Sequence, residues 1–147
     1  FFLNPRPTLA TGRGNILRSL QNYPLGEILL VIPSFSISTV KAYRMCKPKM
    51  YSPSASPNTL AELASEIDNQ FHESLFPSYP ELNQICELLL ECGALAAAVS
   101  GSGSSVFGLF DGSLERNFAM TQLQESTDYT LIPCKMLNSH NYFTLQN

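Results

Sequence analysis

The sequence has no tryptophan, few charged side chains and no apolar run long enough to cross a membrane. Charged residues are 14% of the 147 residues and apolar residues are 44%. This composition excludes a disordered chain, because such chains are poor in apolar residues. No apolar run approaches the roughly 20 residues of a membrane helix. The sequence also opens without Met, and we therefore expect a fragment of a longer protein.

Metal-binding and disulfide patterns are missing as well. No two cysteines have the spacing of a CxxC motif, and the two histidines lie far apart in no metal-binding arrangement. We predict no metal site and no disulfide scaffold. The thiols should be reduced and mostly buried, as in a cytosolic protein. The residues concerned are Cys46, Cys86, Cys92, Cys134, His72 and His140.

Basic residues are few, but they are concentrated at one end. Residues 1–50 hold seven basic side chains and one acidic side chain, whereas residues 51–147 hold two and eleven. The overall charge of −3 argues against a nucleic-acid partner. The basic segment indicates an anionic small molecule or a partner surface, and two solvated faces remain an equally good interpretation.

The alternation of apolar and polar residues predicts both strands and helices. Capping boxes at Thr59–Glu62 and Ser78–Glu81 should begin two helices, and Gly93 should end the second. The second helix should bury one face, made of Leu82, Ile85, Cys86 and Leu89. Strands are predicted at 8–11, 16–17, 27–33, 94–100, 105–111 and 129–136, and helices at about 39–46 and 113–124. A further short strand is suggested at 141–147.

From Glu27 onward the order is strand, helices, strand, strand, helix, strand. This order predicts an α+β fold, the ferredoxin-like split βαβ arrangement, with extra helix in the first crossover. The opening hairpin precedes that unit.

A small-residue loop, Gly101 to Ser105, lies between two apolar segments. Glycines let the backbone approach a ligand closely, and successive N–H groups can bind an anion. The loop is neither a dinucleotide-binding fingerprint nor a Walker loop, because a strand rather than a helix follows it and no Gly-Lys pair occurs. A plain glycine hairpin is an equally good interpretation.

A second feature follows the buried strand, where a hydroxyl-rich loop leads into a short helix. Thr39 and Tyr43 are four residues apart and so share one helical face. An aromatic side chain there could stack on a base, and helix N-termini attract anions. On pattern alone, Tyr43 is more simply the edge residue of an amphipathic helix.

Together with the turn Thr11-Gly12-Arg13-Gly14, these features resemble one family. In this order and spacing they are similar to the C-terminal half of the 4-diphosphocytidyl-2-C-methyl-D-erythritol kinases, which belong to the galactokinase, homoserine kinase, mevalonate kinase and phosphomevalonate kinase (GHMP) superfamily. The segment Val99 to Phe107 matches the third motif of the superfamily. The match is weak in residues 45–80 and 112–147.

The resemblance implies an ATP-dependent kinase of the non-mevalonate pathway of isoprenoid biosynthesis. Such an enzyme transfers the γ-phosphate of ATP, with Mg²⁺, to a hydroxyl of a cytidine diphosphate-linked methylerythritol. Tyr43 would stack on the cytosine, Thr39 would supply a hydroxyl on the substrate side, and the backbone of Arg13 would lie near the cytosine. The loop of Gly101, Ser102, Gly103, Ser104 and Ser105 would border the active site and support the phosphate-binding loop.

The resemblance also implies what these 147 residues lack. The catalytic Asp of the family would lie three residues before Phe1, and the ATP-binding loop further upstream. We therefore assign no catalytic residue and expect the chain alone to be inactive. Residues 1–25 would be a hairpin remnant of the ATP-binding, ribosomal S5-like domain, and residues 26–147 the substrate-binding domain. Besides the substrate, the partner of this chain would be the N-terminal ATP-binding domain of the same protein. The enzyme would lie in the cytoplasm or, if the source is a plant, in a plastid.

Two alternatives remain open. One is another small-molecule kinase of the superfamily, of the homoserine or mevalonate type, and Tyr43 with the opening hairpin argues against it. The other is a stand-alone ferredoxin-like module for ligand binding or dimerisation, which would need its own start codon directly upstream.

Overall fold

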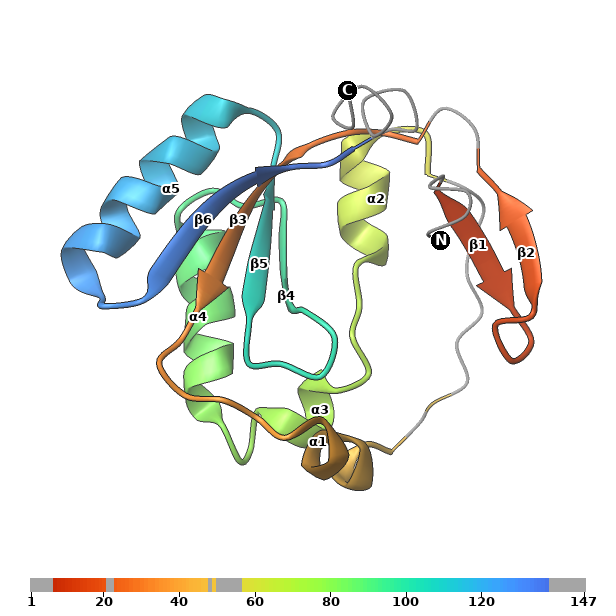
Figure 1. Cartoon of the computed structure of the whole chain (residues 1–147). Coiled ribbons are helices and arrows are strands. Elements are labelled where there is room, and N and C mark those ends of the chain that lie inside the picture. Colours follow the sequence, from red (N-terminus) through yellow and green to blue (C-terminus); the bar gives the residue numbers. More distant parts are fainter. Residues whose placement is uncertain (1–6, 21–22, 48, 50–56, 138–147) are drawn as a thin grey trace, which may run out of the picture.

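The computed structural model describes residues 7–20, 23–47, 49 and 57–137. An opening hairpin of β1 (Thr8–Thr11) and β2 (Ile16–Ser19) forms a sheet of its own. Its turn contains Gly12 and Gly14, both with φ in the left-handed region that favours glycine. Figure 1 shows the hairpin apart from the larger sheet. The predicted hairpin is thus confirmed, and the domain boundary after residue 25 stays a prediction.

The main sheet has four antiparallel strands in the order β4-β5-β3-β6. They are β3 (Glu27–Ile32), β4 (Ala96–Val99), β5 (Val106–Phe110) and β6 (Thr130–Lys135). Each crossover skips one strand, from β3 over β5 to β4 and from β5 over β3 to β6. This is the split βαβ arrangement that the sequence predicts.

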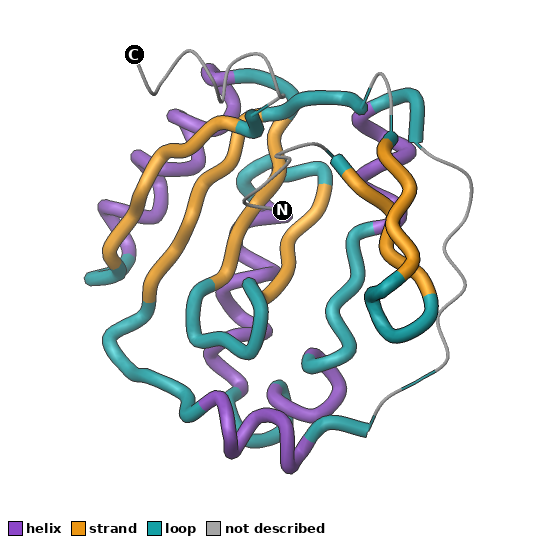
Figure 2. Tube along the Cα trace, turned by 45° about the vertical axis from the view of Figure 1, so that its right-hand side comes forward, coloured by secondary structure: helices purple, strands orange, loops and turns teal. Residues whose placement is uncertain are grey.

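Two long helices cover one face of this sheet (Figure 2). Helix α4 (Pro80–Glu91) packs on β4 and β5, and α5 (Ser113–Ser126) packs on β3, β5 and β6. The predicted apolar face of α4 is buried, and it meets the inward side chains Leu29 and Val31 of β3 in one core. At about 25 cal/mol per Å² of buried apolar surface, this core is the main source of stability.

Three shorter helices complete the first crossover: α1 (Thr39–Met45), α2 (Leu60–Glu66) and α3 (His72–Leu75). The capping box of Thr59 and Glu62 is present at the start of α2, as predicted. The capping box predicted at Ser78–Glu81 is wrong. The N-cap of α4 is Tyr79, with no side-chain cap, and Pro80 begins the helix, because proline is well suited to a first helical position.

The remaining sequence predictions differ from the structure mainly at element ends. Strands β4 and β5 are shorter than predicted, α5 is slightly longer, and α3 was not predicted. Gly93 has a φ of +92° just after α4, which confirms its role as a helix terminator. All four cysteines are free, but the prediction that most of them are buried is wrong, because only Cys86 is buried and the other three are partly exposed. The strand suggested at 141–147 lies outside the described residues.

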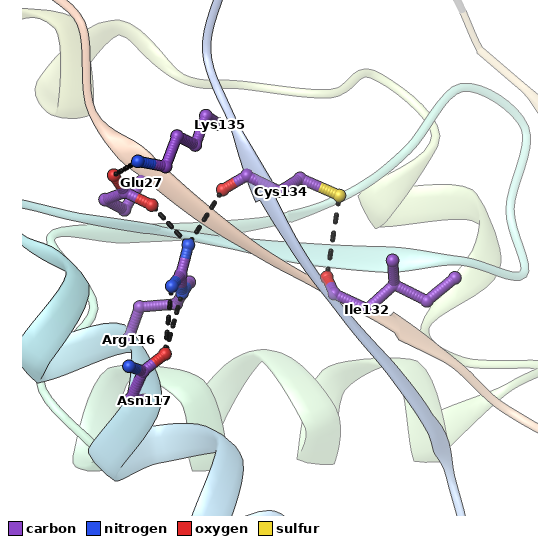
Figure 3. A network of polar contacts seen from close by, with 6 residues as sticks. All are labelled: Glu27, Arg116, Asn117, Ile132, Cys134 and Lys135. Carbon is purple, nitrogen blue, oxygen red and sulfur yellow. Dashed lines mark hydrogen bonds and ion pairs between the residues drawn. The ribbon is translucent and has the colours of Figure 1, made fainter.

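A buried ion pair fastens α5 to the sheet (Figure 3). The Arg116 guanidinium pairs with the Glu27 carboxylate and donates to the Cys134 carbonyl oxygen at 3.3 Å. It also donates to the Asn117 side chain, and Lys135 lies 3.5 Å from the other Glu27 oxygen. Three elements, α5, β3 and β6, are therefore tied together at one end of the sheet.

Candidate functional site

The glycine-rich loop between β4 and β5 is a tight turn, closed by its own backbone. The Ser100 N–H donates to the Ser105 carbonyl at 2.8 Å, and the Gly103 N–H donates to the Ser100 carbonyl at 3.0 Å. Gly101 and Gly103 have φ of +56° and +79°. Nothing lies within 4 Å of a Cβ built on Gly101, whereas one on Gly103 would meet Ile37 and Val99 at 3.3 Å. The backbone is thus approachable at Gly101 and packed onto the core at Gly103.

The loop is bonded to the segment that follows β3. The Ser104 hydroxyl donates to the Phe35 carbonyl oxygen at 2.6 Å. The hydroxyl oxygens of Ser102 and Thr39 lie 3.1 Å apart and share a hydrogen bond. The structure therefore brings together two features that the sequence analysis treated separately, the glycine-rich loop and the start of α1.

Helix α1 presents Tyr43 to solvent. Ser38 is the N-cap and its carbonyl accepts from the Ala42 N–H, but its side chain makes no cap. Ala42 is fully buried and anchors the helix, while Tyr43, the next residue, is 67% exposed. The Tyr43 ring is held by an edge contact with Phe71, with centroids 5.1 Å apart and planes at 87°. The arrangement is an exposed aromatic ring with a fixed support.

Two basic side chains lie on the same helix as Tyr43. The Lys41 ammonium donates to the Tyr79 hydroxyl at 2.8 Å and lies 5.1 Å from the centre of that ring. Tyr79 in turn stacks on Phe35, with centroids 5.8 Å apart. Arg44 is exposed on the same helix. Because α1 has only seven residues, these cations rather than the helix dipole favour an anion here.

Two residues at the start of α3 and just before it also hold the loop, and the sequence analysis missed both. Asn69 and His72 both bind the backbone where β4 passes into the loop. Asn69 before an apolar Phe71 is a typical local turn signal. Nothing local in the sequence indicates that its amide reaches a strand 30 positions away, and the family resemblance was weak in this region.

Arg13 lies at the tip of the hairpin turn, and its N–H donates to the Asn15 side chain at 3.1 Å. In the described part of the chain, no hydrogen bond, ion pair or ring contact joins Arg13 to α1 or to the glycine-rich loop. Its predicted role near the site stays a prediction.

The described residues contain no group of three or more His, Cys, Asp or Glu side chains able to hold a metal ion. We accordingly assign no Mg²⁺ ligand among them. None of the helices in the described ranges is long and apolar enough to cross a membrane.

Comparison with known proteins identifies the domain. Residues 55–127 match the family model described as GHMP kinases C terminal. The chain contains a GHMP kinase C-terminal domain. The predicted family resemblance and the predicted fold are therefore confirmed.

The chain is also similar to curated kinases. The chain is 39% identical over 117 residues to a 4-diphosphocytidyl-2-C-methyl-D-erythritol kinase of Porphyromonas gingivalis, a match that covers 75% of this chain and 42% of the relative. It is homologous to the C-terminal part of such kinases. The chain thus spans less than half the length of the curated relatives it matches.

Two crystal structures share the fold. One is a 4-(cytidine 5'-diphospho)-2C-methyl-D-erythritol kinase, with a TM-score of 0.64 and 23% identity over 86% of this chain and 48% of that chain. The other is a homoserine kinase from Cytophaga hutchinsonii, with a TM-score of 0.62 and 17% identity over 89% of this chain and 48% of that chain. The fold alone therefore does not separate these two kinds of kinase.

Proposed function

We propose that this chain supplies the substrate-binding part of an ATP-dependent kinase that phosphorylates a hydroxyl group of 4-diphosphocytidyl-2-C-methyl-D-erythritol. The reaction is a step of the non-mevalonate pathway of isoprenoid biosynthesis. The observation that carries the proposal is the exposed Tyr43 ring, one helical turn after a Thr39 hydroxyl that contacts the glycine-rich loop. The names of the homologous kinases support it.

The proposed roles follow from the chemistry of each side chain. A planar, exposed ring suits a cytosine base, and such stacking is worth about 1–3 kcal/mol. The Thr39 hydroxyl can donate to or accept from the polar part of the substrate. Lys41 and Arg44 place positive charge near a diphosphate. Arg13 would contribute its backbone near the cytosine.

The glycine-rich loop would border the site of phosphoryl transfer. Phosphoryl transfer depends mainly on positioning and on stabilising charge. A Cβ built on Gly101 would meet nothing within 4 Å, and this open space fits the close approach of a phosphate group or of a neighbouring phosphate-binding loop. ATP itself, with Mg²⁺ to neutralise its charge, would be held mainly by an N-terminal ATP-binding domain of the same protein.

These 147 residues would therefore bind substrate without transferring phosphate. The resemblance places the catalytic Asp and the ATP-binding loop before Phe1, so we expect no ATP-dependent phosphorylation by this chain alone. Phosphorylation of the cytidyl substrate by the purified 147-residue chain would contradict this. The complete enzyme would work in the cytoplasm, or in a plastid if the source is a plant.

Two other functions are distinguishable from this one. A kinase of the homoserine or mevalonate type would have no use for a base-stacking ring, and a stand-alone ligand-binding or dimerisation module would have no preference for cytidine. Tyr43 is thus the residue that separates the three hypotheses.

The test is a titration of the isotope-labelled chain with cytidine 5'-diphosphate, followed by NMR. We expect shifts at Tyr43, Thr39 and the glycine-rich loop, and weaker effects with uridine 5'-diphosphate or homoserine. Tyr43→Ala should weaken binding about tenfold or more, whereas Tyr43→Phe keeps the ring and should bind nearly as well. No response to cytidine diphosphate, or equal binding by Tyr43→Ala, would refute the proposed substrate.

A further inference from the structure

The short segment 69–75 holds the backbone at the end of β4. The Asn69 side-chain amide donates to the Val99 carbonyl at 2.7 Å and to the Gly101 carbonyl at 2.8 Å. The Val99 N–H donates to Nε2 of His72 at 2.9 Å. Val99 is the last residue of β4 and Gly101 lies in the glycine-rich loop, so these bonds act where the strand becomes the loop.

These contacts satisfy backbone groups of β4 that the sheet leaves unpaired. Among the strands that the structure describes, β4 is an edge strand that pairs only with β5, so its outer N–H and C=O groups require partners from elsewhere. At Val99 both groups are satisfied by side chains of this segment. The Asn69 oxygen is also used, because it accepts from the Phe71 N–H at 3.0 Å. Two amide hydrogens on two carbonyl oxygens fix the orientation of this amide.

The same segment supports the other half of the candidate site. Phe71 makes the edge contact that holds Tyr43, and Leu75 lies within 3.7 Å of a Cβ built on Gly103. The Gln70 side chain donates to the Lys49 carbonyl at 2.9 Å, beyond the end of α1. The Tyr43 ring and the glycine-rich loop are therefore both held by segment 69–75.

We propose that Asn69 and His72 are positioning residues, which fix the glycine-rich loop for ligand binding, and that His72 does so only as a neutral imidazole. An imidazole accepts a hydrogen bond at Nε2 only when that nitrogen carries no proton. Protonation of His72 therefore breaks the hydrogen bond from the Val99 N–H. The two hydrogen bonds from Asn69 remain. The identity of the ligand rests on the proposed function, while the positioning itself does not.

The surroundings of His72 are consistent with a neutral ring. Burial, against the Phe76 ring at 4.7 Å, lowers the pKa of His72 below 6.5, and the nearby charge of Asp68 opposes this in part. β4 carries no titratable side chain. Glu73, the next residue, pairs with Lys49. The loop should therefore be held at pH 7 and released as the pH falls below 6.5.

The test is an NMR titration of the labelled chain from pH 8 to pH 5 without ligand. We expect the amides of Val99, Gly101 and Gly103 to shift with the same midpoint as the His72 imidazole nitrogens. His72→Gln supplies an oxygen acceptor that does not titrate, and should abolish those shifts while keeping the loop signals near their pH 8 positions. Glu73→Gln, a change in the same helix that does not touch the loop, should leave the titration unchanged.

Asn69 is tested with a substitution of equal size. Asn69→Asp places carboxylate oxygens against two carbonyls, to which they cannot donate, and should move the same loop amides at every pH. Should Asn69→Asp fail to fold, the His72→Gln titration decides by itself. Loop amides that ignore the His72 midpoint, or that titrate equally in His72→Gln, would overturn the proposal.

The ligand readout separates this proposal from the proposed function. Affinity for cytidine 5'-diphosphate should fall about threefold to tenfold more between pH 8 and pH 5 in the parent chain than in His72→Gln, the worth of one hydrogen bond. Titration of the ligand phosphate affects both proteins alike. No binding at any pH would refute the proposed substrate, and the ligand-free titration would still decide the role of His72. An equal fall in both proteins would refute the effect of His72 on binding.

Discussion

The hydroxyl of Thr39 lies 3.1 Å from the hydroxyl of Ser102, although 63 positions separate the two residues in the sequence. This contact joins the first residue of α1 to the glycine-rich loop, so the proposed substrate side and the proposed phosphate side of the candidate site share one hydrogen bond. A ligand that touches either element acts on both.

Removing either hydroxyl should therefore weaken ligand binding more than it weakens the fold. Thr39→Val and Ser102→Ala each lose one partly solvated hydrogen bond, so unfolding free energy should change by less than about 1.5 kcal/mol. Each should lower the affinity for cytidine diphosphate, and the double variant should lose less than the sum, as expected of a coupled pair. Calorimetric titration measures this.

A matched control for these three variants lies on α5. Thr121 donates to the Asn117 carbonyl of its own helix, so Thr121→Val removes a similar hydroxyl without touching the site. It should leave affinity unchanged. Strictly additive losses from Thr39→Val and Ser102→Ala would show that the two hydroxyls act independently.

Gly103 should tolerate a side chain less well than Gly101. Both have a positive φ, which costs an alanine about 1–2 kcal/mol. A Cβ at Gly103 additionally meets Ile37 and Val99 at 3.3 Å, while one at Gly101 meets nothing within 4 Å. Urea unfolding should give a larger loss for Gly103→Ala than for Gly101→Ala. Equal losses would mean that the core yields easily at this point.

The Arg116–Glu27 pair should matter far more than an exposed pair. Both side chains are largely buried, so Arg116→Met leaves the Glu27 carboxylate with only the longer contact to Lys135. We expect a loss of about 2–4 kcal/mol, somewhat below the usual cost of breaking a fully buried pair. Lys49→Met, which breaks the solvent-exposed pair with Glu73, should cost at most about 1 kcal/mol. Similar losses of unfolding free energy for Arg116→Met and Lys49→Met, measured by urea unfolding, would contradict this prediction.

The thiol of Cys86 should stay protonated and unreactive well above neutral pH. Burial within the core, with a smaller effect of the Glu87 charge, raises the pKa of Cys86 from 9.0 to about 11. Iodoacetamide at pH 8 should leave it unmodified while the partly exposed Cys134 reacts. Mass spectrometry of the labelled peptides distinguishes the two sites.

The same shift predicts a loss of stability in alkali. The folded chain binds the Cys86 proton more tightly than the unfolded chain, so stability is fully present below pH 9 and falls as the pH rises toward 11. The pKa of Tyr129, raised to about 12 chiefly by burial, extends the fall above pH 10. Cys86→Ala should show a shallower decline between pH 9 and 11, and an identical slope would contradict the assignment.

The sequence predicts the fold well where the signals are local or periodic. The strand at Glu27–Ile32, the apolar face of α4 and the cap at Thr59 follow from spacing within a few residues. The cap at Ser78 failed because Pro80 competes for the same helix start, and position-specific preferences for proline are stronger than a four-residue pattern.

The candidate site was less predictable. The residue pattern singled out Thr39, Tyr43 and the glycine-rich loop, but only the family resemblance gave them roles, and the contact between Thr39 and the loop comes from tertiary structure alone. Asn69 and His72 were missed because each bonds to backbone atoms. Every residue has the same backbone groups, so the sequence does not show which residue such a side chain will contact.

The position of β3 at the centre of the sheet has a consequence for the order of events during synthesis. β3 ends at Ile32, but the strands on its two sides begin only at Val106 and Thr130. Pairing across such sequence separations makes folding slow, because a long stretch of chain must close before any contact is gained. The apolar β3 strand therefore emerges from the ribosome long before its neighbours exist, and chaperones have that interval in which to protect it from aggregation.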